Sequence, residues 1–159
     1  MMCEKEVGIV ELQLVREKTV LYRNKSGTPC IEHPEDIVEM MKPLIASLDK
    51  EQVFVLCMDA HSQPVAVSRI SIGTSNNAIC NPAEIMKTAL MTNSIHIALI
   101  HSHPSGNPVP SNEDKQITER VKKAGELMGI ELEDHIIIGD NGDGELRFYS
   151  FFREGRMEV

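Results

Sequence analysis

The sequence contains no tryptophan, and aromatic residues make up only 4% of its 159 residues. A core of this composition must depend on Ile, Val, Leu and Met rather than on large rings. No apolar run approaches the roughly 20 residues that a membrane-spanning helix needs. The N-terminal sequence MMCEKEVGIV also lacks the apolar segment and cleavage site of a signal peptide. These absences argue against a membrane or secreted protein and favour a cytoplasmic one.

Cysteine is scarce and scattered, and no Cys-x-x-Cys pair occurs. The four residues are Cys3, Cys30, Cys57 and Cys80. Without a secretion signal, such spacing is typical of reduced thiols and does not support a disulfide framework or a thiolate metal site. The chain also has no internal repeat and no low-complexity tract.

Basic residues are outnumbered, with 16 Lys and Arg against 24 Asp and Glu and a formal charge of −8. From residue 101 to the end of the sequence, 12 acidic residues face 7 basic ones. An acidic surface repels nucleic-acid phosphates and anionic lipids at long range. We therefore expect neither direct nucleic-acid binding nor membrane binding.

Strand-like and helix-like segments alternate along the chain. Strands are predicted at 7–15, 52–58, 65–72, 95–100, 135–139 and 145–151, and helices at 33–48, 81–92 and 111–129. Pro43 is expected to bend or shorten the first helix, and Asn81 is expected to cap the second. This order predicts one α/β domain with a mixed sheet over 1–159. Its core is expected at about 30–152, after an N-terminal strand and linker at 1–29.

The segment HSHPSGNPVPSNED at 101–114 is the most informative part of the sequence. Residues two apart in a strand point to the same face, so His101 and His103 can direct two imidazoles at one point. A Gly- and Pro-rich loop then leads to a helix whose first turn contains Asp114. Two imidazoles and a carboxylate form the three-ligand shell of a catalytic Zn²⁺ site, which leaves one position for water.

Ser111 and Asp114 also have a simpler interpretation. Their spacing is that of a capping box, in which each side chain satisfies the backbone N–H of the other residue. The two interpretations are compatible, because Ser111 can cap the helix and still present its hydroxyl to a metal site.

The pattern H-x-H-P-x6-S-x-x-D resembles that of the JAMM (MPN-plus, or JAB) metallo-isopeptidase domains. With EDHIIIG at 133–139, the sequence resembles the RadC family more closely, over about residues 10 to 151. Ser102 stands where RadC proteins usually have Asn, and the helix-hairpin-helix region of full-length RadC proteins is missing from this sequence. We therefore expect a short, stand-alone RadC-like JAB domain.

This resemblance implies a single JAB/MPN domain with a cytidine-deaminase-like fold, in which helices flank a mixed sheet. It implies Zn²⁺ bound by His101, His103 and Asp114, with Glu51 as general base and Ser111 as a stabilising hydroxyl. Glu51 matches the first residue of the RadC pattern E-x-F-x-V-L-x-L-D. Without the family it would be an ordinary surface residue, and Glu84 would compete with it, although a helix start gives Glu84 a capping role.

The implied activity is hydrolysis of a peptide or isopeptide bond in a protein or peptide substrate. Two alternatives stay open: a non-catalytic JAB module that binds protein partners, and a DNA-repair-associated RadC-like protein that acts through partners. The complete set of five site residues favours the hydrolase. Substrate specificity is expected in loops such as 73–81 and 140–144.

The remaining histidines and one acidic neighbour have weaker signals. We expect His33, His61 and His96 to be structural or solvated. Asp134 and His135 belong to the RadC-like pattern, and they fit either a layer of residues that orients a metal ligand or a buried hydrogen-bonding role at the start of a strand.

Overall fold

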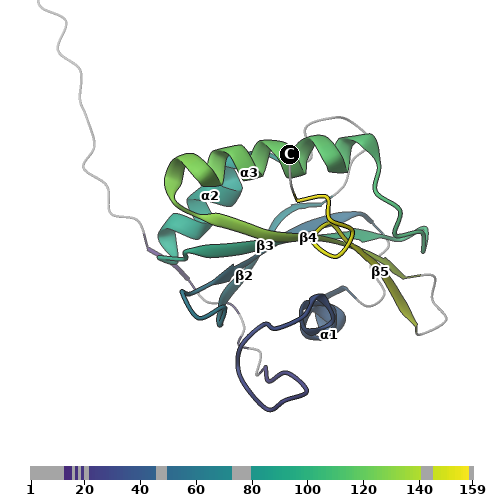
Figure 1. Ribbon diagram of the computed structural model, residues 1–159, viewed down its shortest axis with the longest axis horizontal. Helices are drawn as coiled ribbons and strands as arrows, with labels where there is room; N and C mark the ends of the chain where they lie inside the picture. The colour runs from purple at the N-terminus through teal and green to yellow at the C-terminus, as the bar shows by residue number, and fades with distance from the viewer. Residues whose placement is uncertain are drawn as a thin grey trace, which may run out of the picture.

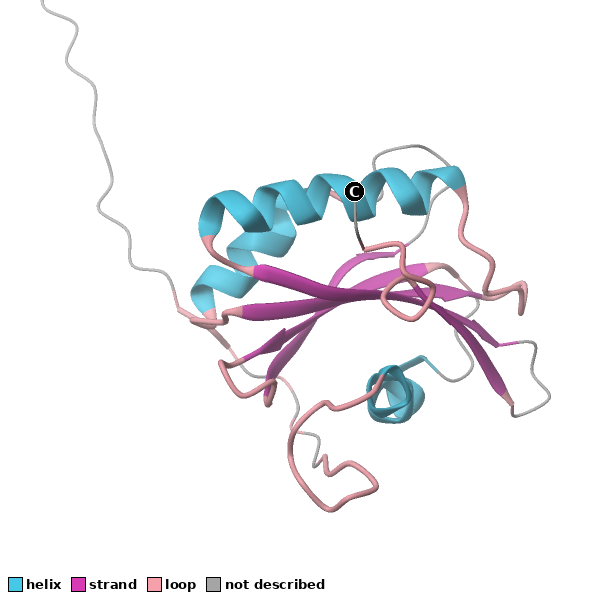
Figure 2. Ribbon diagram, viewed as in Figure 1, coloured by secondary structure: helices cyan, strands magenta, loops and turns pink. Residues whose placement is uncertain are grey.

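A computed structural model of the chain contains one sheet with helices packed on both faces (Figure 1, Figure 2). The structure describes residues 13–15, 17, 19, 22–45, 50–72, 80–140 and 145–157. The described helices are α1 (Pro34–Ile45), α2 (Pro82–Met91) and α3 (Asn112–Met128). The described strands are β1 (Gln52–Met58), β2 (Pro64–Ile72), β3 (His96–His103), β4 (Glu131–Asp140) and β5 (Leu146–Ser150). The predicted α/β fold is confirmed.

The five strands lie in the order β2-β1-β3-β4-β5. Strands β3 and β4 are parallel, and the other neighbouring pairs are antiparallel. A parallel pair needs a long crossover connection, and α3 supplies it between β3 and β4. The sheet is therefore mixed, as the sequence predicts.

Helix α1 covers one face of the sheet, and α2 and α3 cover the other (Figure 1). Successive residues of a strand point to opposite faces, so each central strand contributes to two cores. Leu56 and Ile100 pack on the α1 side, whereas Val55 and Leu99 pack on the α2 and α3 side. His101 and His103 point to the same face as Leu99, because they follow it at intervals of two residues in β3. Both imidazoles therefore lie on the α3 side of the sheet.

Most predicted elements are found, and their bounds differ in an informative way. Strand β1 has the predicted bounds, and the side chain of Asn81 accepts a hydrogen bond from the backbone of Ala83 as the cap of α2. Strand β3 continues through both histidines, and β4 begins four residues before the prediction, at Glu131. The polar sequence at the start of β4 obscures it, because four of its first five residues are acidic or His.

Other predictions need correction or lie outside the described residues. Pro43 lies inside α1, whose bounds are Pro34–Ile45, and residues 46–48 of the predicted first helix lie outside the described part of the chain. The sequence places Val121, Leu127 and Met128 at apolar positions of the third helix, but only Val121 is buried, and Leu127 and Met128 are exposed. Residues 13–15 have no regular secondary structure, and residues 7–12 of the predicted first strand lie outside the described part of the chain, as do 73–79 and 141–144 of the two predicted specificity loops. None of the described helices is long and apolar enough to cross a membrane.

The loop after β3 packs closely against β4. A Cβ added to Gly139 would lie only 2.4 Å from the backbone oxygen of Gly106. The glycine in β4 therefore lets the loop reach a position that any side chain would block. The backbone of Asn107, the next loop residue, is 3.2 Å from the same added Cβ.

A buried carboxylate connects β4 to the turn after β5. Asp134 accepts hydrogen bonds from the Ser150 hydroxyl at 2.6 Å and from the Phe152 backbone N–H at 2.9 Å. Burial raises the pKa of Asp134 to about 6, because hydrogen bonds that favour the ionised form only partly offset the loss of water. Of the two interpretations of Asp134, the contacts fit the buried hydrogen-bonding role.

We expect Gly139→Ala to destabilise the protein by about 1–3 kcal/mol, the usual cost of overpacking a close contact. The added methyl group meets a backbone oxygen, which cannot rotate away as a flexible side chain can. Urea unfolding monitored by circular dichroism measures the effect. Gln116→Ala, at an exposed position of α3, is the control and should change stability by less than about 0.5 kcal/mol. An unchanged midpoint for Gly139→Ala would contradict the close packing of the loop.

We also expect a pH dependence of stability that Asp134→Asn abolishes. The pKa of Asp134 is raised on folding from an ordinary value of 3.8 to about 6. Its stabilising contribution is thus fully present below the unfolded pKa and is lost as pH rises toward the folded pKa. Between pH 4 and 6 the wild type should lose about 2–3 kcal/mol relative to Asp134→Asn. Urea unfolding of both proteins across this range tests it, and parallel profiles would contradict the raised pKa.

Candidate metal centre

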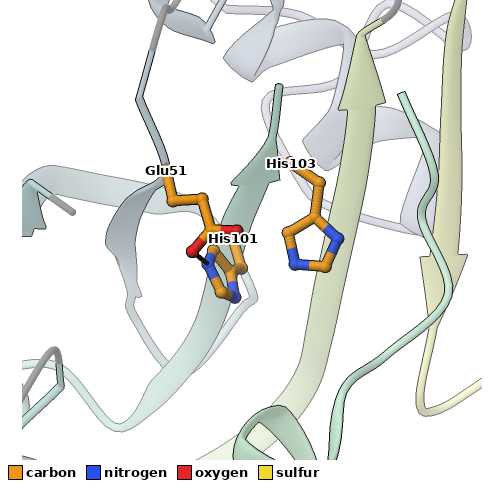
Figure 3. A group of neighbouring side chains, drawn as sticks. All are labelled: Glu51, His101 and His103. Carbon is orange, nitrogen blue, oxygen red and sulfur yellow. Dashed lines mark ion pairs between the residues drawn. The ribbon is translucent and has the colours of Figure 1, made fainter. Parts of the chain in front are cut away.

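Two imidazoles lie side by side where β3 ends. The ring centroids of His101 and His103 are 4.6 Å apart, with the planes nearly perpendicular. Each side chain is 11% exposed, so the rings are largely withdrawn from water but not sealed off. Figure 3 shows both side chains extending from the end of the strand, with Glu51 reaching toward His101.

Backbone contacts determine which nitrogen of His103 carries its proton. Its Nδ1 lies 2.8 Å from the backbone oxygen of Asn107. A carbonyl only accepts hydrogen bonds, so Nδ1 must be the donor. In the neutral ring the lone pair is then on Nε2, which is the form that a metal binds.

A carboxylate gives His101 the same arrangement. Its Nδ1 lies 2.6 Å from Oδ1 of Asp114. Burial by itself raises the pKa of Asp114, but hydrogen bonds from His101 and Ser111 outweigh this effect and hold the pKa well below its usual value. The ionised carboxylate accepts the Nδ1 proton, and Nε2 of His101 is buried with no hydrogen-bond partner among the described residues. Such an unpartnered buried nitrogen is expected of a metal ligand, and Nε2 of His135 is unpartnered in the same way.

Asp114 is held by the first turn of α3. Its Oδ2 accepts hydrogen bonds from the Ser111 backbone N–H at 2.7 Å and from the Ser111 hydroxyl at 2.5 Å, while the Asp114 N–H donates to the Ser111 hydroxyl oxygen. The capping box is therefore present. The same Oδ2 lies 3.8 Å from Nε2 of His103, so capping leaves the carboxylate facing the histidines.

Strand β1 brings Glu51 to the same place. Gln52 pairs with Ser102 and Val53 with His101 across the antiparallel ladder, which puts Glu51 beside the end of β3. Its Oε2 lies 3.8 Å from Nε2 of His101, and the side chain is 49% exposed. Glu51 is thus in reach of both the His101 imidazole and the solvent.

Ser102 fixes the relative positions of these two strands. It lies between the two histidines in sequence but is buried and points to the opposite face of the sheet. Its hydroxyl accepts from the Gln52 N–H at 3.1 Å and donates to the Gln52 carbonyl oxygen at 3.4 Å. Ser102, which departs from the usual RadC pattern, therefore connects β3 to β1 at the residue next to Glu51.

The structure brings all five predicted site residues into one cluster, namely Glu51, His101, His103, Ser111 and Asp114. Donor atoms of Glu51, His101 and His103 lie within 4.8 Å of one another, and so do those of His101, Asp114 and His135. The predicted ligand set of His101, His103 and Asp114 is divided between these two groups. Imidazole nitrogen and carboxylate oxygen are zinc ligands, so the donor set can hold a metal ion. A cavity of about 790 Å³ lies elsewhere, at the start of β4, and none of the five predicted site residues lines it.

Glu84 and the three histidines that precede the 101–114 segment lie away from this cluster or have other partners. Glu84 is exposed in the first turn of α2 and pairs with Lys87 at 2.5 Å. His33 and His61 are exposed, and Nδ1 of His96 faces Glu133 at 3.1 Å. The three histidines are thus structural or solvated, as predicted, whereas Glu84 forms an ion pair and Asn81 is the residue that caps α2.

Thr118 is a neighbour of the site that the sequence analysis did not identify. Its buried hydroxyl donates to the backbone oxygen of Asp114 at 2.6 Å and contacts Nδ1 of His135 at 2.7 Å. A threonine one helical turn after Asp114 is a signal that could have led to it, because a threonine hydroxyl can bond the carbonyl four residues earlier.

Comparison with known proteins agrees with this geometry. A family model described as the RadC-like JAB domain matches residues 31–157. Among similar curated proteins, a UPF0758 protein of Desulforamulus reducens is 38% identical over 142 residues, which cover 86% of this chain and 63% of that protein. A UPF0758 protein of Methanosarcina barkeri is 40% identical over 120 residues, 76% of this chain and 52% of the relative.

The chain thus spans about half to just under two thirds of the length of these relatives. The family model itself covers most of the chain and includes every residue of the cluster. The chain belongs to the RadC-like JAB domain family.

Proposed function

We propose that this protein is a zinc-dependent hydrolase that cleaves a peptide or isopeptide bond in a protein or peptide substrate. The observation that carries the proposal is the convergence of two imidazoles whose Nδ1 atoms are both occupied by hydrogen-bond acceptors. Each ring is left with Nε2 as the ligand atom, and carboxylates lie 3.8 Å from both Nε2 atoms.

The three zinc ligands in this proposal are His101, His103 and Asp114. Asp114 suits a ligand because it is buried and ionised. Its Oδ1 accepts the Nδ1 proton of His101, so the proposal assigns the zinc to Oδ2, which lies 3.8 Å from Nε2 of His103. Glu51 is half exposed, which suits a group that exchanges protons with water and substrate. Three protein ligands leave one coordination position open, as catalytic zinc sites do.

When bound, zinc lowers the pKa of a water ligand to about 7 and polarises the carbonyl group of the substrate. Glu51 accepts the proton of the attacking water and returns it to the leaving amine. The half-exposed position of Glu51 gives its carboxylate access to both groups. Ser102 keeps the distance between base and ligands constant through its two hydrogen bonds to Gln52.

Ser111 stabilises the negative charge that develops on the carbonyl oxygen. Its hydroxyl donates to Oδ2 of Asp114 in the free site, so its proton turns toward the substrate during the reaction. One such donor contributes on the order of 10²–10³ in rate.

The charge of the chain supports a protein substrate. A net charge of −8 opposes direct contact with nucleic acid, whereas a role in DNA repair through partners is compatible with it. The names of the relatives state no activity. A non-catalytic JAB module is therefore the alternative that the following two experiments test.

Purified protein dialysed against zinc should retain about one zinc ion per chain, as a three-ligand site requires. His103→Ala should lose this ion, because two ligands bind too weakly to survive dialysis. His61→Ala, which removes an exposed imidazole in the β1–β2 turn, is the matched control and should keep it. Elemental analysis measures the content. Wild-type protein without metal would contradict the site.

Glu51→Gln should keep the zinc and lose amide hydrolysis by about 10²-fold or more, the usual contribution of a general base. A mixed pool of fluorogenic peptide amides is the assay, with metal content measured on the same samples. Glu84→Gln is the control and should retain full activity. If Glu51→Gln is as active as the wild type, Glu51 is not the base. If zinc-loaded wild type cleaves no member of the pool, the non-catalytic alternative gains support.

A further inference from the structure

His135 is a buried imidazole beside the metal centre that the proposed chemistry does not use. It is 1% exposed. Its ring lies nearly parallel to that of Phe151, with centroids 5.1 Å apart, and nearly parallel to that of His101 at 6.4 Å. Packing alone would be served as well by phenylalanine, so the nitrogen atoms need a separate explanation.

The hydroxyl of Thr118 determines the tautomer of His135. A hydroxyl has one proton, and Thr118 directs it to the backbone oxygen of Asp114 at 2.6 Å. At its 2.7 Å contact with Nδ1 of His135, the hydroxyl oxygen must therefore be the acceptor, and the ring must donate. Burial lowers the pKa of His135 to about 3, in agreement with a neutral ring that carries its proton on Nδ1.

These two hydrogen bonds form a chain from β4 to α3 that ends at Asp114. His135 donates to Thr118, and Thr118 donates to Asp114. The side chain of Asp114 is meanwhile held by Ser111 and His101. The backbone and the carboxylate of one residue are thus anchored to different elements, the backbone to β4 and the carboxylate to β3 and its own cap.

We propose that Thr118 and His135 are positioning residues for the metal centre, which fix the backbone of Asp114 so that its carboxylate faces His101 and His103 before the metal binds. This inference rests on the proposed function. Its physical basis is preorganisation: a ligand that is already in place loses no further conformational freedom on binding. Loss of such outer hydrogen bonds usually weakens metal binding or activity by 10–100-fold.

The alternative is that the pair only stabilises the core. In that case its loss would lower the free energy of unfolding and leave the zinc affinity of the folded protein unchanged. Zinc affinity, measured by competition with a chromophoric chelator, and the absorption spectrum of the Co²⁺-substituted protein separate the two. Neither readout requires a substrate or catalytic turnover.

Two variants break the hydrogen bond from opposite ends. His135→Phe keeps an aromatic ring against Phe151 but removes the Nδ1 donor, and Thr118→Val keeps the side-chain shape but removes the hydroxyl. Two conservative variants test rescue. Thr118→Ser keeps the hydroxyl, and His135→Asn keeps an N–H donor near the position of Nδ1.

Ser150→Ala is the matched control. It removes another buried hydroxyl, which bonds Asp134 on the α1 side of the sheet. Urea unfolding of the metal-free Ser150→Ala variant measures how much stability is lost when a buried hydrogen bond on the other face of the sheet is removed. The stability loss of the His135 and Thr118 variants is compared with this value.

We expect His135→Phe and Thr118→Val to weaken zinc binding by about 10–100-fold and to alter the Co²⁺ spectrum. Thr118→Ser and His135→Asn should bind more tightly than the variants they rescue, and Ser150→Ala should bind like the wild type. Because the two disruptive variants cut the same bond, either one that folds suffices for the test.

If both disruptive variants bind zinc as tightly as the wild type, the positioning role is wrong and the proposed metal centre still stands. If the wild type itself binds no zinc, the proposed function fails, and this inference fails with it. A loss of affinity in Ser150→Ala equal to that in Thr118→Val would also overturn the inference, because general destabilisation would then explain both.

Discussion

The candidate metal centre depends on one buried charge, the carboxylate of Asp114. Removing a carboxylate from water is costly unless hydrogen bonds replace the lost hydration. Ser111 supplies two donors and His101 supplies a third, at 2.5 to 2.7 Å. These bonds keep the carboxylate ionised at 2% exposure, and in return the carboxylate fixes the tautomer of His101. The same carboxylate therefore caps α3 through Ser111 and orients the ring of His101 at the end of β3.

The sheet explains why the arrangement is compact. Strand β3 ends between β1 and β4, so residues from three neighbouring strands meet there. The antiparallel partner contributes Glu51 at its start, and the parallel partner contributes His135. Helix α3 begins near this point and supplies Asp114 and Thr118. The hydrogen-bond ladder of the sheet positions Glu51 and the histidines, and the first turns of α3 position Asp114 and Thr118. Groups on such regular elements have a more precise geometry than groups on loops.

The sequence allowed much of this to be predicted, because the chemistry is concentrated in 14 consecutive residues. The spacing of His101 and His103 in a strand and the capping distance between Ser111 and Asp114 are local properties, and local periodicity suffices for them. Glu51 is different. Its side chain meets His101 only through pairing between β1 and β3, so its proposed role was accessible through family resemblance and not through residue patterns.

Contacts that join distant segments were the hardest to predict. The Thr118–His135 hydrogen bond spans 17 residues and exists only because α3 packs across β4. The start of β4 was missed for a related reason. Glu131 and Glu133 conceal a strand whose later residues are apolar, and the bulge where Ala98 pairs with Asp134 further disrupts the alternation. Burial of Asp134 and His135 depends on partners that no local pattern reveals.

The tie between Ser102 and Gln52 has a consequence for how this site tolerates change. Because the side-chain period of a strand is two residues, a slip of β1 against β3 by one position would turn Glu51 to the α1 face. Ser102 holds both backbone groups of Gln52 and so opposes that slip from within the sheet. The distance between the Glu51 carboxylate and the two imidazoles is thus set by the pairing of β1 with β3 and not by the surface loops. Surface loops can therefore change in sequence and length while the distance between the Glu51 carboxylate and the imidazoles of His101 and His103 stays the same.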